Sequence, residues 1–343
     1  MSQDVHTGAL PGAYYDRVKD EHLVALWRVP ETDAPEPAPR EVPYVWHYDA
    51  LLPLLDEACA VDLGGESDRR ALNAINPGRD WGTTQSMVAG YQMVLPGETA
   101  PAHRHTPAAI RLLLEGSGLT TVEGEPVRME PGDLVLTPGW TWHDHRNDTD
   151  TTMVWLDGLD VPFVRGMNAQ FYEDYEGKEL QELTQQEDGS VARFGAGIVP
   201  SDEVPIPRHS PLTKYSYAST LASLENLWQG SGTPSRGVSI DYVHPRTGGP
   251  VLPTLACSAH LVPTGGGSIA RRHTSSTVFC VTRGSGYSVI DGVRHDWSHK
   301  DFFVVPSWTW YEHHAEGDES VTLFSMSDRP LLEPFGLYRE ETA

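Results

Sequence analysis

The sequence has few of the residues that would tie it to a disulfide scaffold or a membrane. Three of its 343 residues are cysteine, and they form no C-x-x-C pair. Their number and spacing do not make a disulfide framework, and we expect Cys257 and Cys280 to be reduced core residues. No run of about 18 apolar residues occurs, and the first residues lack the charged start and apolar centre of a secretion signal. We therefore expect a cytoplasmic protein that does not bind membranes.

Positive charge is also scarce. Lysine and arginine together number 25 against 48 aspartates and glutamates, which gives a formal net charge of −23, and no basic block interrupts this excess. Nucleic acids and anionic membrane surfaces attract basic patches, so neither is an expected partner. The length predicts two domains of roughly 150 residues each, or one large β-rich unit.

Short apolar runs separated by Gly and Pro turns occupy residues 83–165 and 250–328. Turns at intervals of roughly 8 to 12 residues are typical of all-β sandwiches and barrels. Helical periodicity lies outside these regions, in residues 12–27, 48–61 and 215–228. The acidic, proline-containing segment 172–213 is interpreted as a linker.

The two β regions are copies of each other. The segment AHRHTPAAIRLLLEGSG at 102–118 aligns with ARRHTSSTVFCVTRGSG at 270–286, and DLVLTPGWTWHDH at 133–145 aligns with DFFVVPSWTWYEH at 301–313. Both pairs are offset by 168 residues (270 − 102 and 301 − 133), with no gap between them. The chain is therefore predicted to be all-β, with two similar barrels.

Residues kept in both copies are expected to serve the fold, whereas reactive residues in one copy are candidates for function. The kept residues are mainly those of turns and packing, such as Gly116 with Gly284 and Trp140 with Trp308. The polar residues that change from the first copy to the second are His103 to Arg271, His143 to Tyr311, Arg111 to Phe279, Asp157 to Ser325 and Gln92 to His260. Only the first copy is expected to hold a complete site.

Three histidines of the first copy form a candidate metal site. His103 and His105 are two residues apart, so on a strand both side chains point to the same face. Two buried imidazoles without partners would each cost roughly a few kcal/mol, and a metal ion removes that cost. An isolated H-x-H is more often a pair of surface or hydrogen-bonded histidines. Here the strand-turn-strand segment PGDLVLTPGWTW can bring His143 back beside the other two, which favours the metal site.

Two motifs resemble the cupin family: G-x5-H-x-H followed by Gly116, and G-x5-P-x-W-x2-H-x3-N from Gly132 to Asn147. That family usually places a glutamate ligand shortly after H-x-H, but Ala109 and Ile110 occupy this window, which argues against the oxalate-decarboxylase kind. The segments NPGR, YQMVLPGETAPAHRHTPAAIR, TPGWTWHDHRND and WLDGLD, with GGPVLPTLACSAH, PSWTWYEH and GLYRE in the second copy, resemble gentisate 1,2-dioxygenases and their salicylate and 1-hydroxy-2-naphthoate relatives.

This resemblance implies a bicupin: two double-stranded β-helix barrels with an N-terminal helical segment and a helical linker, usually assembled as a homotetramer. The expected parts are N-terminal helices and arm at 1–80, a metal-binding barrel at 81–170, a linker with a helix at 171–248, and a degenerate barrel without metal at 249–343. The family's Fe(II) ligands correspond to His103, His105 and His143, and its active-site arginine, glutamine and aspartate to Arg111, Gln92 and Asp157.

Each further candidate has a functional and a structural interpretation. Arg111 lies an even six residues after His105, which returns it to the inner face of a regular strand. There it would hold a substrate carboxylate or a developing negative charge, unless it is a surface arginine at a strand end. Gln92 is interpreted as a hydrogen-bond donor to substrate or oxygen, or as a buried amide tied to the backbone. Asp157 would fix a ligand histidine or the arginine. His145 recurs as His313 in the second copy, so a structural and an acid/base role are both open.

The expected partners are dioxygen and a small aromatic acid with an ortho hydroxyl group. The resemblance implies an extradiol-type cleavage of gentisate between C1 and C2 to maleylpyruvate. Three neutral imidazoles would leave Fe(II) its full charge, which suits the binding of such an acid. The alternatives are the same chemistry on salicylate, a substituted salicylate or 1-hydroxy-2-naphthoate, since no residue is seen to recognise the 5-hydroxyl group. An alternative of another class is a non-catalytic bicupin that binds a small acid, and Mn(II) in place of Fe(II) also stays open.

Overall fold

The computed structural model describes residues 10–29, 33–61, 70–177, 180–201, 205–233 and 236–343. The chain divides into two units, residues 1–38 and 39–343. No helix among the described residues is both long and apolar enough to cross a membrane.

The first unit contains the helix α1 (Gly12–Asp20) and the 3-10 helix η1 (Leu26–Arg28). The helix expected over residues 12–27 therefore ends early, because His22 adopts a left-handed conformation with a φ of 57°. No residue of α1 is buried within the chain.

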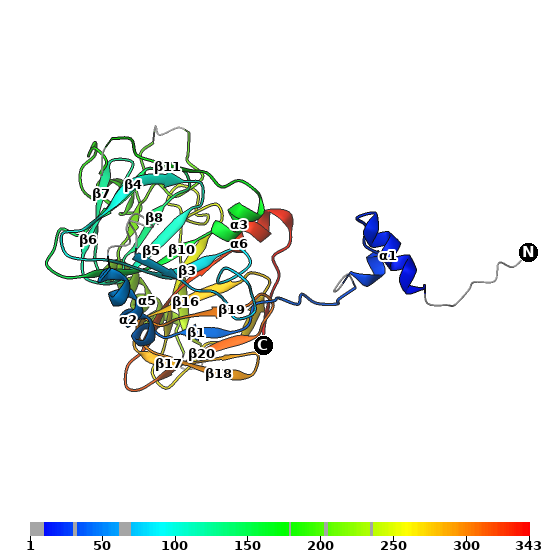
Figure 1. Ribbon diagram of the computed structural model, residues 1–343. Coiled ribbons are helices and arrows are strands. Elements are labelled where there is room, and N and C mark those ends of the chain that lie inside the picture. The colour runs from blue at the N-terminus through cyan, green and yellow to red at the C-terminus, as the bar shows by residue number, and fades with distance from the viewer. Residues whose placement is uncertain (1–9, 30–32, 62–69, 178–179, 202–204, 234–235) are drawn as a thin grey trace, which may run out of the picture. The chain divides into compact units, whose positions relative to one another are not determined.

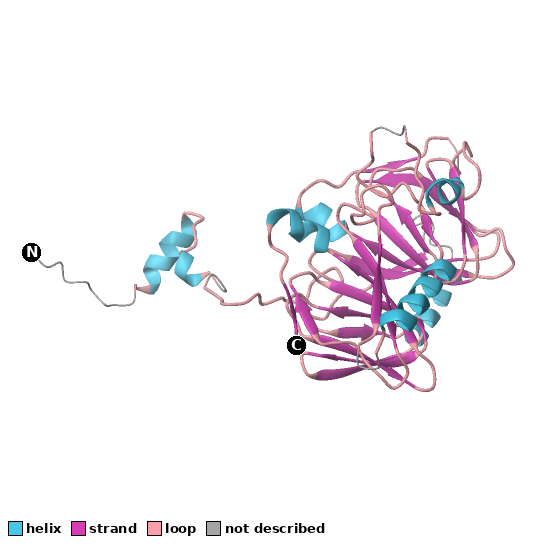
Figure 2. Cartoon of the chain, turned by 180° about the vertical axis from the view of Figure 1, so that it is seen from behind, coloured by secondary structure: helices cyan, strands magenta, loops and turns pink. Residues whose placement is uncertain are grey.

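The second unit is built mainly of strands, with short helices at its periphery (Figures 1 and 2). Its helices among the described residues are α2 (Tyr48–Cys59), α3 (Val161–Gly166), α4 (Gly189–Phe194), α5 (Tyr217–Ser231), α6 (Arg329–Leu332) and η2 (Glu333–Phe335). Its strands up to the start of α5 are β1 (Tyr44–Trp46), β2 (Arg70–Asn73), β3 (Val88–Val94), β4 (Thr99–His105), β5 (Ala109–Glu115), β6 (Gly118–Val122), β7 (Glu125–Met129), β8 (Leu134–Thr137), β9 (His143–Arg146), β10 (Met153–Leu159), β11 (Tyr172–Asp174) and β12 (Lys214–Tyr215). The later strands are β13 (Val238–Tyr242), β14 (Ala256–Val262), β15 (Arg271–His273), β16 (Thr277–Arg283), β17 (Ser285–Ile290), β18 (Val293–Trp297), β19 (Phe302–Val305), β20 (Tyr311–Glu316), β21 (Val321–Ser327) and β22 (Glu340–Thr342).

In the described parts of the chain these strands form four sheets, two for each barrel. The first barrel combines a six-stranded sheet, in the order β12-β8-β5-β10-β3-β2, with a five-stranded sheet, β11-β4-β9-β6-β7. The second barrel combines β1-β19-β16-β21-β14-β13 with β18-β17-β20-β15-β22. The strand order is equivalent in the two barrels, so the prediction of an all-β fold with two similar barrels is confirmed.

Each barrel takes an edge strand from the segment that precedes the other barrel. Strand β1 comes before the first barrel in sequence but pairs with β19 of the second, and β12 comes before the second barrel but pairs with β8 of the first. The helix that follows each of these strands packs on the other barrel. Helix α2 follows β1 and packs on β2 and β3 of the first barrel, and α5 follows β12 and packs on β13 and β14 of the second. The two barrels are thereby joined through crossing segments as well as through a shared core.

That shared core lies between the two six-stranded sheets. Ile110 and Leu112 of β5 contribute to it, as does Val278 of β16. Each such buried aliphatic side chain contributes roughly 2 kcal/mol. Since side chains alternate along a strand, Arg111 and Leu113 point into the first barrel instead, where Leu113 joins a separate apolar cluster. This alternation explains how an arginine comes to lie within a buried strand.

A buried aspartate accepts a backbone hydrogen bond at the same place in both barrels. Oδ1 of Asp160 accepts from N of Ala108 at 2.8 Å, and Oδ1 of Asp328 accepts from N of Ser276 at 2.9 Å. Burial raises the pKa of each carboxyl to about 6. Because the contact is present in both copies, it supports a structural role for the pair.

Replacing Asp160 with asparagine is expected to change how stability depends on pH. A carboxyl whose pKa is raised on folding adds stability that is complete below pH 3.8 and is lost as the pH rises through about 6. A rise from 3.8 to about 6 corresponds to about 3 kcal/mol. The free energy of unfolding should be measured with urea at about pH 4 and about pH 7.5. Between these two pH values, the stability of Asp160→Asn relative to the unsubstituted protein should rise by up to about 3 kcal/mol. Parallel pH profiles for the two proteins would contradict this expectation.

Candidate metal centre

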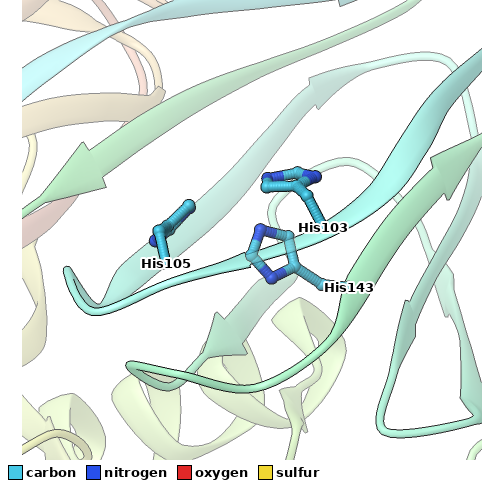
Figure 3. A group of neighbouring side chains, drawn as sticks. All are labelled: His103, His105 and His143. Atoms are coloured by element: carbon cyan, nitrogen blue, oxygen red, sulfur yellow. The ribbon is translucent and has the colours of Figure 1, made fainter. Parts of the chain in front are cut away.

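The three candidate histidines meet on two neighbouring strands of the five-stranded sheet in the first barrel (Figure 3). His103 and His105 come from β4, and His143 begins β9, where it pairs directly with His103. Their potential ligand atoms all lie within 4.8 Å of one another. The ring centroids of His103 and His143 are 4.1 Å apart, and those of His105 and His143 are 4.8 Å apart. The structure therefore brings together the three residues that the H-x-H spacing and the strand-turn-strand segment single out.

Backbone carbonyls fix the orientation and the tautomer of each ring. The Nδ1 atoms of His103, His105 and His143 donate to the carbonyl oxygens of Pro101 (2.8 Å), Pro107 (2.7 Å) and Thr141 (2.9 Å), respectively. A carbonyl oxygen only accepts, so the proton of each ring is on Nδ1 and a lone pair is on each Nε2. Such outer contacts orient histidine ligands in metal sites.

Burial favours neutral rings. His103 and His143 are 2% and 1% exposed. The pKa of His143 lies well below its ordinary value, chiefly because burial penalises the charged ring, and further because a charged His143 would be repelled by the neighbouring His103, if that ring were also charged, and by Arg111. Nε2 of His143 is buried and has no hydrogen-bond partner among the described residues. An orphaned buried nitrogen is costly, and a set of three neutral imidazoles suits a divalent transition metal, so these residues fit a bound metal ion.

Arg111 and Asp157 form an ion pair in the six-stranded sheet of the same barrel. They occupy directly paired positions on β5 and β10, and Nε of Arg111 lies 3.4 Å from Oδ1 of Asp157. The guanidinium also donates to Oγ1 of Thr137. Both charged side chains are almost completely buried. The guanidinium of Arg111 is near enough to His143 to lower the pKa of that ring.

Gln92 of β3 is only 4% exposed, and its amide nitrogen makes no hydrogen bond with any residue that the structure describes. Its neighbours Tyr91 and Met93 belong to the core between the barrels, so by alternation Gln92 faces the interior of the first barrel. A buried amide donor in this position is available to an oxygen atom of a bound molecule. Both interpretations of Gln92, as a donor to a bound molecule and as a buried amide tied to the backbone, stay predictions.

The surroundings of His145 are repeated in the second barrel. Nδ1 of His145 lies 2.8 Å from Oγ1 of Thr120, and Nδ1 of His313 lies 2.8 Å from Oγ of Ser288. The two hydroxyl residues are themselves equivalent in the duplicated sequence. This shared contact supports the structural interpretation of His145, while its acid/base role stays a prediction.

Two residues near the site are absent from the set that the sequence suggests. Thr137 accepts a hydrogen bond from Arg111, and Tyr172 of β11 stacks on His103 with ring centroids 5.6 Å apart. The comparison of the two copies contains a signal for Thr137, because Val305 stands at the equivalent position. Tyr172 has no such signal: it lies in the segment interpreted as a linker, and only the pairing of β11 with β4 brings it to the histidines.

The described residues of the second barrel contain no such histidine cluster. Arg271 pairs with Tyr311 at the position where His103 pairs with His143 in the first barrel. Within the described residues, the three histidines of the first barrel are the only group of three or more His, Cys, Asp or Glu side chains arranged to hold a metal. A duplicated barrel with converging imidazoles in one copy defines a bicupin with a single candidate metal centre.

Comparison with known proteins identifies the family. The profile of the Cupin domain family matches residues 90–159 and 259–327, once in each barrel. A gentisate 1,2 dioxygenase of Aquipseudomonas alcaligenes is 37% identical over 332 residues, which cover 95% of each chain. A 5-aminosalicylate 1,2-dioxygenase of Comamonas sp is 35% identical over 96% of this chain and 89% of the relative. The salicylate 1,2-dioxygenase of Pseudoaminobacter salicylatoxidans, solved with gentisate, is 35% identical and superimposes with a TM-score of 0.90 over 100% of this chain and 97% of its own. The chain belongs to the gentisate 1,2-dioxygenase family of ring-cleaving dioxygenases.

Proposed function

We propose that this protein uses Fe(II), bound by His103, His105 and His143, to cleave gentisate between C1 and C2. In this reaction both atoms of one dioxygen molecule are added to gentisate while the C1–C2 bond breaks, which gives maleylpyruvate. The observation that carries the proposal is the convergence of three imidazoles, with Nδ1 protonated, beside a buried arginine. The names of the relatives support the substrate class.

The chain's own residues supply the geometry and the charge of the site. When bound, Fe(II) with three neutral nitrogen ligands would keep its full charge and act as a Lewis acid toward the carboxylate and 2-hydroxyl oxygens of the substrate and toward dioxygen. The carbonyls that accept from each Nδ1 hold the three rings in place, with their potential ligand atoms within 4.8 Å of one another. Burial keeps His143 neutral, which is the form a metal ligand needs.

Arg111 and Gln92 are proposed to bind the substrate. Asp157 and Thr137 hold the guanidinium of Arg111, which would then attract the substrate carboxylate or the negative charge that develops as the ring opens. The amide nitrogen of Gln92 would donate a hydrogen bond to a substrate oxygen. In this proposal Asp157 acts through Arg111 and is a positioning residue.

Salicylates are the second candidate substrates. Relatives that cover most of this chain at nearly the same identity include the 5-aminosalicylate enzyme at 35% and a 1-hydroxy-2-naphthoate 1,2-dioxygenase of Nocardioides sp. at 34%. Since none of the residues discussed above is placed to recognise the 5-hydroxyl group of gentisate, overall similarity alone does not separate these substrates.

Oxygen uptake by the Fe(II)-loaded protein tests the substrate. We expect uptake of one dioxygen per molecule of gentisate, with lower catalytic efficiency on salicylate and on 1-hydroxy-2-naphthoate. Mass spectrometry of the product made under labelled dioxygen should find both labelled atoms in maleylpyruvate. Uptake on salicylate but not on gentisate would replace the first candidate with the second. No uptake on any of the three acids, with iron bound, would refute the proposal. Loading with Mn(II) in parallel tests the identity of the metal.

The quaternary structure and location expected from the sequence also remain proposals. We propose a homotetramer, because the family resemblance implies one, and a cytoplasmic location. Light scattering coupled to size-exclusion chromatography measures the mass of the assembly, and a mass other than four chains would contradict the first of these.

A further inference from the structure

The interior of the second barrel contains a cavity of about 300 Å³ that the proposed reaction does not use. It lies between strands β13 to β16, β20 and the end of α5. Residues that matter for its chemistry are His260, Arg271, Phe279, Tyr311 and His313. Its lining among the described residues includes two arginines, Arg236 and Arg271, and two histidines but no aspartate or glutamate; carboxylates line the adjoining cavity, which shares Arg271 and Phe279 with it.

This cavity overlaps the place that the metal site occupies in the first barrel: it is lined by Arg271 and Tyr311, the equivalents of His103 and His143, while His273, the equivalent of His105, lines the adjoining cavity. Arg271 stands where the first copy has His103, and Phe279 pairs with Ser325 where Arg111 pairs with Asp157. The buried ion pair of the first barrel has therefore been replaced by an aromatic ring and a hydroxyl. The guanidinium of Arg271 stands where the first barrel has the imidazole of His103. The second barrel therefore has a positively charged side chain at a position where the first barrel has a neutral metal ligand.

The polar groups of the cavity are suited to an anion. Arg271 is about one-third exposed, and the nearest carboxylate recorded for it, that of Glu340, is a loose contact at 3.8 Å. His313 is only 3% exposed, and its Nε2 has no hydrogen-bond partner within the described chain.

The proton of His313 is placed by two buried neighbours. Trp297 donates from Nε1 to Oγ of Ser288 at 2.8 Å, and this Oγ lies 2.8 Å from Nδ1 of His313. The Ser288 hydroxyl accepts from the indole and donates to Nδ1, which leaves the proton of the imidazole on Nε2. Burial lowers the pKa of His313, so the ring is neutral. Nε2 therefore offers a hydrogen-bond donor at the cavity.

The floor of the cavity is aromatic. The ring centroid of Phe279 lies 4.6 Å from that of His313, 5.6 Å from that of His260 and 5.7 Å from that of Tyr311. These rings pack on one another and line the cavity, so a further ring bound there would meet aromatic side chains. A cavity of about 300 Å³ that combines aromatic side chains with a few fixed polar groups is large enough for a small molecule.

We propose that the second barrel is a metal-independent binding site for a small aromatic carboxylate. The carboxylate binds the guanidinium of Arg271 and the Nε2–H of His313, and the ring packs against Phe279. The site is separate from the metal centre, and it does not depend on which acid the metal centre cleaves.

Crystals of the metal-loaded protein soaked in 4-bromobenzoate test this proposal directly, because the anomalous signal of bromine locates the ligand. We expect a bromine peak in the second barrel, over Phe279, with the carboxylate on Arg271. The absence of a peak there at saturating ligand would overturn the proposal.

A pair of adjacent variants separates the site from a general charge effect. Arg271→Gln removes the proposed contact, whereas Arg272→Gln removes an arginine whose side chain binds Glu341 at 2.8 Å and stacks on Trp308. Calorimetric titration with 4-bromobenzoate should show the dissociation constant of the second-barrel site rising at least about tenfold in Arg271→Gln, and unchanged in Arg272→Gln. Retention of the bromine peak in Arg271→Gln would show that the arginine does not form the site.

Discussion

The His105→Ala variant is expected to lose its metal and its ring-cleaving activity, whereas His273→Ala keeps both. The two residues are equivalent in the duplicated barrels, and each donates from Nδ1 to a carbonyl two residues later, Pro107 at 2.7 Å and Ser275 at 2.9 Å. Both variants therefore lose the same local hydrogen bond. Only His105 belongs to the cluster of three histidines. Because loss of an outer partner of a ligand already lowers metal affinity about 10- to 100-fold, loss of a ligand should exceed that.

Metal content by mass spectrometry and oxygen uptake on gentisate measure the two effects, and circular dichroism checks that both variants fold. We expect His105→Ala to contain no metal and to be inactive, and His273→Ala to be fully active. If both variants lose metal to the same extent, the assignment of a single metal site to the first barrel is wrong.

The Arg111→Gln variant is expected to keep its metal but to lose catalytic efficiency by roughly 10²- to 10³-fold, the usual effect of removing one preorganised charge from an active site. The change also takes the cation away from Asp157, whose side chain is 8% exposed. Removing one partner of a buried ion pair costs about 3–5 kcal/mol of stability. The double variant Arg111→Gln/Asp157→Asn removes both charges, so it should recover stability without recovering activity.

Arg128→Gln is the control for this pair. Arg128 is 29% exposed and pairs with Asp148 at 2.6 Å. It is not one of the residues assigned to the metal centre. Its loss should leave activity unchanged and alter stability by at most about 1 kcal/mol. Steady-state kinetics and thermal unfolding distinguish the cases. Recovery of activity in the double variant would show that Arg111 serves only to neutralise Asp157.

Much of the architecture was predictable because it depends on local pattern. The 168-residue offset between the copies can be found from the spacing of matching residues alone. It predicted both barrels and which of them holds the histidine cluster. The strand period of two predicted that His103 and His105 share a face, and the same period put Arg111 inside the barrel. The helix expected at 215–228 is observed at 217–231, where Ser216 caps its first turn by accepting from N of Ser219.

Long-range pairing was not predictable from these patterns. The exchange of β1 and β12 between the barrels joins segments far apart in the chain, and no local period encodes which edge a short strand will meet. The approach of Tyr172 to His103 depends on the same kind of pairing.

The sequence by itself determined the kinds of group at the site and their strand faces, because residue type and alternation are local properties. Tertiary structure alone decided that the three rings converge, since His143 reaches His103 only through the pairing of β9 with β4. It also decided that Arg111 meets Asp157 across β5 and β10, and that Arg271 and His313 share a cavity with Phe279 in the second barrel. The residues of each site come from different strands, so they come together only when the strands pair into sheets.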